Sequence, residues 1–153
     1  MTWPQYRRLM SRRLPMNRFV TFFYALLDPR RHTLTYVNAG HNPPWILRRD
    51  GVTADRLTQT GRPLGLFEKS TYEAKTVDMA PGEVLLCYSD GVTEATNPAE
   101  EEFGEDLLRR LLGEARKGSP YDIIRRITAE IETHHGGGPR QDDITLVALK
   151  RTD

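Results

Sequence analysis

The chain has 153 residues, of which 38% are hydrophobic and 28% are charged, and its formal net charge is +1. This length suits one domain with a buried core, and this composition excludes a disordered chain. The near-neutral charge gives no support for a protein that binds nucleic acid or an anionic membrane. The arginines that gather before residue 19 are interpreted as a solvated helix face rather than as a nucleic-acid arm.

The first half of the chain predicts a basic helix followed by three strands. The helix is expected from Gln5 to Leu14 and ends near Pro15, which cannot continue it. Aromatic and β-branched residues favour a strand from Phe19 to Leu27, and alternation favours a return strand from Thr33 to Ala39. A third strand is expected from Trp45 to Arg49.

The second half predicts two strands, two consecutive helices and a last strand. Tyr72 to Met79 reads as an edge strand, and the apolar run from Val84 to Tyr88 reads as a core strand. Apolar residues at helical spacing follow Phe103, and a second helix starts at Pro120 behind a serine cap. The final strand is expected from Ile144 to Lys150. Strands and helices in this order predict an α+β layered fold with mostly antiparallel sheets and segregated helices.

Two carboxylate positions share a design that suits a metal. Asp90 follows the apolar core strand, and Asp142 and Asp143 precede the last strand. Carboxylate oxygens are the ligands that Mg²⁺ and Mn²⁺ prefer, and a pair of such ions activates water for attack on phosphate. The alternative is that these aspartates only cap a turn and a loop, as Asp often does.

For the other candidate residues, the sequence context favours structural roles over binding or catalysis. His134 and His135 are interpreted as a solvated helix end, with metal or phosphate binding as the alternative. The loop from Thr60 to Gly65 lacks the lysine and hydroxyl ending of a nucleotide loop, so a shaped loop is favoured over a phosphate cradle. Cys87 lies in an apolar strand, so we expect a buried, inert thiol. A single cysteine, no secretory signal and no run of about 20 apolar residues favour a cytoplasmic protein.

Four segments resemble one family in order and spacing. They contain "NAGHNPP", "GRPLGL", "YSDGVTEA" and "DDITL", and they extend over most of the chain from about Arg18. The sequence is similar to the SpoIIE/RsbU-type branch of the PPM (PP2C-like) serine/threonine protein phosphatases. The resemblance implies an αββα sandwich with a dinuclear Mn²⁺ or Mg²⁺ centre. It also implies hydrolysis of phosphoserine or phosphothreonine by metal-activated water, usually on anti-anti-sigma (STAS) proteins.

The resemblance assigns roles to individual residues. Asp90 of "SDG" and Asp142 of "DDIT" match the catalytic metal ligands, and Asp143 matches an adjacent supporting position. Gly91 is expected to permit the tight turn beside the metal. The remaining matched residues are expected on a loop that borders the cleft, namely Asn38, Gly40 and His41. Of these, His41 is not expected to bind metal directly.

The sequence departs from the family at its start. Two acidic motifs of the family, like "GGDFYD" and "DVSGHG", do not occur in these residues. The expectation is a single domain over 1–153 that lacks the first strands, with 1–17 as the end of the first helix and 18–150 as the sheet and helix core. Two functions therefore stay open, a metal-dependent phosphatase and a catalytically incomplete module that binds a regulatory protein. The missing strands also predict exposed sheet edges and a homodimer through one of them.

Overall fold

The computed structural model describes residues 18–66, 70–137 and 142–152. The chain divides into two compact units, one formed by Met1–Pro43 with Leu57–Asp78 and the other by Pro44–Arg56 with Met79–Asp153. Each unit contains its own antiparallel sheet. The helix expected from Gln5 to Leu14 lies outside the described residues.

The first unit holds a three-stranded sheet in the order β1–β2–β5. β1 (Phe22–Asp28) and β2 (Thr33–Ala39) form the predicted hairpin. Its turn is held by Asp28, whose Oδ1 accepts hydrogen bonds from the backbone N–H of Arg30 and Arg31 at 3.0 and 3.1 Å. β5 (Lys75–Asp78) pairs with β2 at the edge, as its weak alternation predicted.

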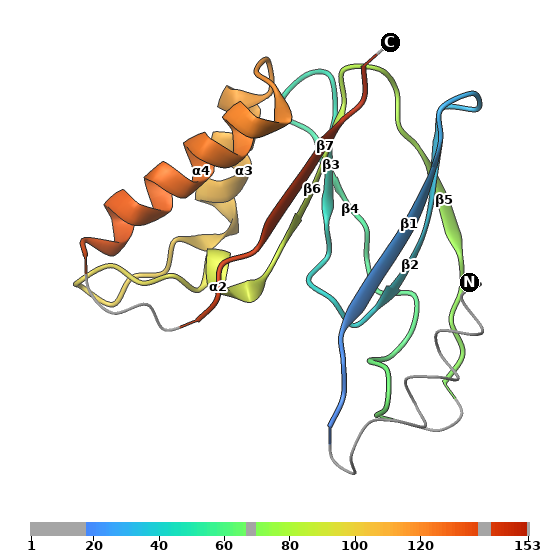
Figure 1. Ribbon diagram of the computed structural model, residues 1–153, viewed down its shortest axis with the longest axis horizontal. Coiled ribbons are helices and arrows are strands. Elements are labelled where there is room, and N and C mark those ends of the chain that lie inside the picture. Colours follow the sequence, from blue (N-terminus) through green and yellow to red (C-terminus); the bar gives the residue numbers. More distant parts are fainter. Residues whose placement is uncertain (1–17, 67–69, 138–141, 153) are drawn as a thin grey trace. The chain divides into compact units, whose positions relative to one another are not determined.

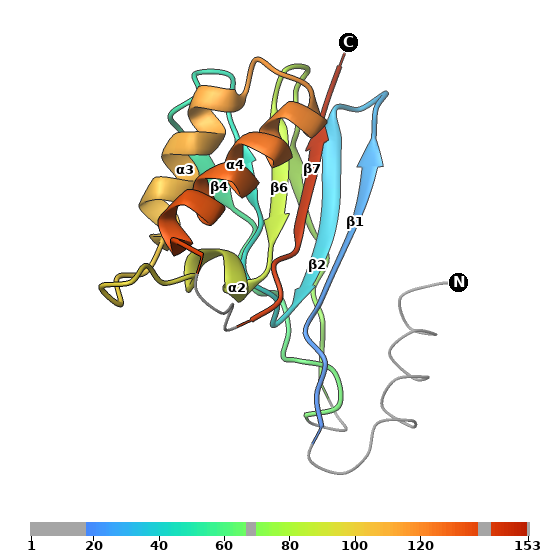
Figure 2. The ribbon, with the colours of Figure 1, turned by 60° about the vertical axis from the view of Figure 1, so that its left-hand side comes forward.

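The second unit holds a four-stranded sheet in the order β4–β3–β6–β7, in which all neighbours are antiparallel. α3 and α4 cover one face of this sheet (Figure 1, Figure 2). The bounds are β3 (Trp45–Leu47), β4 (Ala54–Arg56), β6 (Val84–Tyr88), α2 (Asp90–Thr93), α3 (Gly104–Ala115), α4 (Pro120–His135) and β7 (Leu146–Lys150). The helix start predicted at Pro120 is confirmed. The Oγ of Ser119 accepts from the N–H of Asp122, and the carboxylate of Asp122 accepts from the N–H of Ser119.

The core of the second unit lies between its sheet and its helices. Alternate residues of β6 point into this core, namely Val84, Leu86 and Tyr88. They meet the apolar stripes of both helices, which consist of Leu108, Leu111, Leu112, Ile123, Ile127 and Ile131. Leu85 and Cys87 alternate with the core residues of β6 and therefore lie on the other face of the sheet. Cys87, which the sequence predicted to be a buried thiol, is partly buried.

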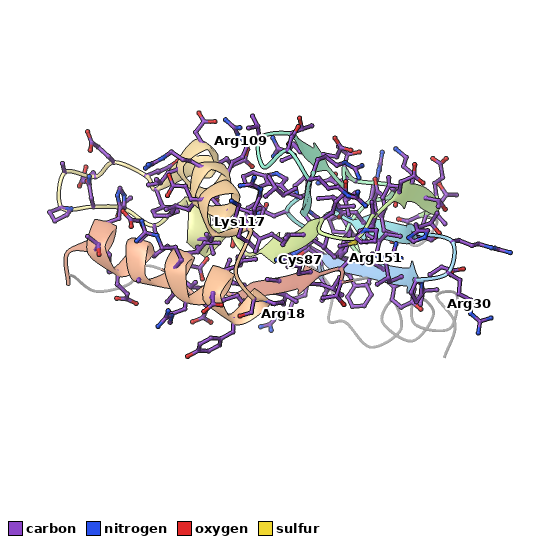
Figure 3. All side chains as sticks on the ribbon, turned by 90° about the horizontal axis from the view of Figure 1, so that it is seen from above. Arg18, Arg30, Cys87, Arg109, Lys117 and Arg151 are labelled. Atoms are coloured by element: carbon purple, nitrogen blue, oxygen red, sulfur yellow. The ribbon has the colours of Figure 1, made fainter. Side chains whose placement is uncertain are left out.

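Two side chains tie the helices to the sheet. The ammonium group of Lys150, the last residue of β7, donates to the carbonyls of Arg116 at 2.9 Å, Lys117 at 3.3 Å and Gly118 at 2.9 Å. A cation beside the carbonyls that end a helix is stabilising, because those carbonyls have no intrahelical partner. Arg109 on α3, labelled with Lys117 in Figure 3, donates to the carbonyl of Val52 in the β3–β4 turn at 3.3 Å.

The predicted α+β class with mostly antiparallel sheets is confirmed by these two sheets and by helices gathered on one of them. In the described part of the chain, none of the helices combines the length and the apolar character that crossing a membrane requires.

Candidate metal centre

The pairing of β6 with β7 brings the two candidate carboxylates to one end of the second sheet. Tyr88, the last residue of β6, pairs with Leu146, the first residue of β7. Asp90 follows the end of β6 and Asp142 precedes the start of β7. Because neighbouring antiparallel strands end and begin at the same edge, both carboxylates lie at that edge.

Ser89 joins the two segments that carry the aspartates. Its N–H donates to the carbonyl of Thr145 at 3.0 Å, and its Oγ accepts from the N–H of Thr145 at 3.0 Å. The same hydroxyl donates to the carbonyl of Asp143 at 3.0 Å. This serine therefore fixes the backbone beside Asp142. This role has no local sequence signal, since the partners lie more than fifty residues away in the chain.

Gly91 lies at a position where the neighbouring backbone leaves no room for a side chain. It lies inside the short helix α2, and its φ is not among the positive values that the backbone adopts at other glycines. A Cβ at this position would lie 2.5 Å from the carbonyl oxygen of Asp143 and 3.3 Å from the Cβ of Asp142. Gly91 therefore allows the Asp142–Asp143 backbone to come close to α2, and its expected place beside a bound metal stays a prediction.

Both carboxylates are exposed and partly anchored. The Oδ1 of Asp90 accepts from the N–H of Gly91 at 3.0 Å, and the Oδ1 of Asp142 accepts from the N–H of Asp143 at 2.7 Å. Two exposed carboxylates fit the donor set of a hard cation such as Mg²⁺, which is often bound by one or two carboxylates and keeps several waters. Across residues 18–66, 70–137 and 142–152, no three His, Cys, Asp or Glu side chains gather closely enough to hold a metal.

A small pocket of about 50 Å³ lies against Gly91 and Asp142. Its apolar wall comes from Ala95, Ile131 and Ile144, and its other lining residues are Glu94, Thr96 and His135. One water molecule needs about 10–15 Å³ of such a cavity, so the pocket has room for only a few waters or a small chemical group.

His134 and His135 lie in the last turn of α4, as the sequence predicted, but both are partly buried and contact backbone carbonyls as well as solvent. The Nε2 of His134 lies 2.9 Å from the carbonyl of Glu101, and its ring meets Phe103 edge-on at 5.5 Å. The Nδ1 of His135 lies 3.2 Å from the carbonyl of Thr96. A carbonyl only accepts, so Nδ1 of His135 carries the proton. Its Nε2 is buried and has no hydrogen-bond partner among the described atoms.

The other predicted site residues belong to the first unit. Asn38 is fully buried, and its amide donates to the carbonyls of His41 at 3.1 Å and Leu57 at 3.0 Å while its Oδ1 accepts from the N–H of His41. Gly40 has a φ of +78°, and a Cβ there would lie 2.5 Å from the ring of Pro63. Asn38 therefore shapes the loop from within. The expectation that Asn38, Gly40 and His41 border the metal cleft stays a prediction.

Known proteins resemble the chain over nearly its whole length. The family model described as Stage II sporulation protein E (SpoIIE) matches residues 4–152. The chain is 37% identical over 136 residues to Protein IcfG of Synechocystis sp., covering 89% of this chain and 21% of that protein. It is 27% identical over 151 residues to phosphoserine phosphatase RsbU of Bacillus subtilis, covering 94% of this chain and 42% of that protein. The chain thus spans less than half the length of these two relatives.

Solved structures agree with the fold. The SiaA-PP2C domain of Pseudomonas aeruginosa matches with a TM-score of 0.81 at 21% identity, over 96% of this chain and 58% of that one. The phosphatase domain of SpoIIE from Bacillus subtilis matches with a TM-score of 0.69 at 19% identity, over 97% of this chain and 64% of that one. With the family model and the motifs around Asp90 and Asp142, these matches confirm the resemblance seen in the sequence. The chain belongs to the SpoIIE family, the SpoIIE/RsbU-type branch of the PPM (PP2C-like) phosphatases.

Proposed function

We propose that this chain is part of a metal-dependent protein serine/threonine phosphatase, to which it contributes the metal ligands Asp90 and Asp142. The single observation that carries the proposal is the pairing of β6 with β7, which presents both carboxylates at one sheet edge. Two relatives, RsbU and RsbP of Bacillus subtilis, bear the name phosphoserine phosphatase. The proposed substrate is a phosphorylated regulatory protein of the STAS type, and the proposed location is the cytoplasm.

Mn²⁺ or Mg²⁺, when bound to these carboxylates, would supply a polarised water and neutralise charge on the phosphate. The chain's own part is to hold two anionic side chains in place before the cation arrives. Backbone N–H groups anchor one oxygen of Asp90 and one of Asp142, so both side chains lose less freedom on binding. Ser89 fixes the 143–145 backbone, and Gly91 leaves room for it. Such supporting contacts typically change metal affinity by about 10–100-fold when they are lost.

The second candidate function is a regulatory module that binds a partner protein without hydrolysis. It is favoured by the ligand count, because the described residues offer two carboxylates at this edge and no cluster of three metal-binding side chains. Carboxylates supplied from outside this chain would remove the basis for this alternative.

An aspartate outside the candidate site provides a matched control for the phosphatase proposal. D142N removes a proposed ligand, whereas D106N makes the same chemical change at an exposed side chain in the first turn of α3. We expect Mn²⁺ binding, measured by isothermal titration calorimetry on the 153-residue chain, to be lost in D142N and D90N and kept in D106N. Phosphate release from a phosphorylated STAS protein should follow the same order.

Each outcome separates the two functions. Mn²⁺ binding that is equal in the wild type, D90N and D142N would overturn the assignment of both ligands. A wild-type chain that binds the STAS protein but takes up no Mn²⁺, even at millimolar concentration, would favour the regulatory module.

A further inference from the structure

The last turn of α4 fastens the loop that follows α2. The Nδ1 of His135 donates to the carbonyl of Thr96 at 3.2 Å, and the Nε2 of His134 lies 2.9 Å from the carbonyl of Glu101. Thr96 and Glu102 pair with each other in an antiparallel bridge. Two consecutive side chains of one helix therefore hold the two opposite arms of the 96–102 loop.

α2 depends on contacts of this kind for its position. It has four residues, and so short a helix is not stable by itself in water. Ser89 ties the start of α2 to the backbone of Thr145. At its end, the N–H of Glu94 donates to the carbonyl of Asp90 at 2.9 Å, and the chain reaches Thr96 two residues later. Since Asp90 is the first residue of α2, the contact of α4 with Thr96 helps to place its carboxylate.

The ring of His135 also borders the pocket beside Asp142. His135 and Ile131 of α4 line this pocket together with Gly91 of α2 and with Asp142. The end of α4 therefore lies against both segments that carry the candidate metal ligands. All of these residues belong to the second unit.

The Nδ1–H of His135 is the property that an apolar side chain could not supply. Nδ1 carries the proton, because the carbonyl of Thr96 only accepts. Nε2 is then a bare acceptor, which is buried without a hydrogen-bond partner among the described atoms. A buried acceptor without a partner destabilises a fold, so packing alone would favour an apolar ring at this position. The donor to Thr96 is the feature that accounts for an imidazole here.

We propose that His135 is a positioning residue of the candidate metal centre. It holds the end of α2 through the carbonyl of Thr96 and thereby places Asp90 for the cation. Its action passes through the backbone and needs no contact with the metal or the substrate. The inference rests on the proposed function, because it requires Asp90 to be a metal ligand.

Amide substitutions separate the two nitrogens of the ring. The side-chain amide of asparagine reaches the position of Nδ1, and that of glutamine reaches the position of Nε2. H135F keeps a ring of similar size and has no donor. We expect Mn²⁺ affinity, measured by calorimetry on the whole chain, to fall about tenfold in H135F and in H135Q and to stay close to the wild-type value in H135N.

Hydrogen exchange reports on α2 without any metal. In metal-free samples, peptides that cover residues 89–97 should exchange faster in H135F and H135Q than in the wild type and H135N, whereas peptides of β6 should exchange alike in all four proteins. The ¹⁵N resonances of the neutral His135 ring should show a protonated Nδ1 and a bare Nε2 in the wild type. The opposite tautomer would overturn the proposed contact.

The remaining outcomes are distinguishable. A wild type that binds Mn²⁺ no more tightly than H135F would overturn the positioning role and leave the metal centre intact. An H135Q protein that keeps the affinity lost in H135N would assign the effect to Nε2 and overturn the inference too. A wild type that takes up no Mn²⁺ would overturn the proposed function together with the positioning role. Urea unfolding checks that each variant is folded, and the comparison of H135N with H135Q decides the matter even where H135F does not fold.

Discussion

Replacing Gly91 with alanine should disturb the candidate metal centre without removing a ligand. The added Cβ would lie 2.5 Å from the carbonyl oxygen of Asp143, whereas ordinary contacts begin near 3.4 Å. The Asp142–Asp143 backbone or α2 must therefore move by about 0.9 Å. Overpacking of this kind costs about 1–3 kcal/mol, and the better helix propensity of alanine returns at most about 1 kcal/mol. We expect a net loss of about 1 kcal/mol in the free energy of unfolding.

The displaced segment carries Asp142, so Mn²⁺ affinity should fall about tenfold in G91A, at the low end of the range for lost supporting contacts. G113A is the matched control, because Gly113 lies in α3 and a Cβ there would lie 2.5 Å from the carbonyl oxygen of Gly51. Urea unfolding should show similar destabilisation in both variants. Calorimetry should show weaker Mn²⁺ binding in G91A only. A G91A protein with wild-type stability and wild-type Mn²⁺ affinity would refute the reasoning about this close approach.

Three further predictions concern other groups of the second unit. Burial raises the pKa of the Cys87 thiol to about 11, from an ordinary value of 9.0. Below pH 9, Ellman's reagent should therefore react about tenfold more slowly with Cys87 in the native chain than in the unfolded chain. Equal rates for the two states would contradict this prediction. S119A should lose about 1 kcal/mol of stability by urea unfolding. Hydrogen bonds from Ser119 hold the pKa of Asp122 below its ordinary 3.8, so they stabilise the folded chain above pH 3.8. The stability difference between the wild type and S119A should therefore shrink as the pH falls below 3.8. A difference that stays constant down to acid unfolding would show that the Asp122 carboxylate plays no part. Burial, with the nearby charge of Glu105, raises the pKa of Tyr88 above its ordinary 10.0. The free energy of unfolding of the wild type should therefore decline as the pH rises past 10, and that of Y88F should decline less steeply. Equal declines in the two proteins would show that another group causes the loss of stability at high pH.

Elements with a strong local pattern were predictable from the sequence. β2 and β6 have the predicted bounds, because each is an apolar or alternating run closed by turn residues at both ends. β4 was missed, since its three residues Ala54, Asp55 and Arg56 carry no alternating apolar signal. It forms because the Asp50 carboxylate holds the preceding turn through the N–H groups of Val52 and Thr53, both at 2.8 Å. α2 was missed because a four-residue helix that contains a glycine looks like a turn.

The residues of the candidate site also divide into those that local sequence pattern predicts and those that depend on tertiary contacts. Asp90 and Asp142 were predictable because each stands where an apolar strand ends or begins. The supporting role of Ser89 and the steric role of Gly91 were not predictable from local pattern, because both depend on backbone atoms at Asp143 and Thr145. The contact of His134 and His135 with the 96–101 loop depends in the same way on tertiary packing.

The division of the chain into two interleaved units limits how this protein can be dissected. The backbone passes from one unit to the other after Pro43, after Arg56 and after Asp78, so no single cut separates them. A fragment that starts at Met79 would retain both aspartates but would lose β3, the strand that pairs with β6 on the side away from β7. Its sheet would keep only two strands, which are rarely stable alone in water. The candidate metal centre therefore depends on the earlier part of the chain, and substitution rather than truncation is the way to study it.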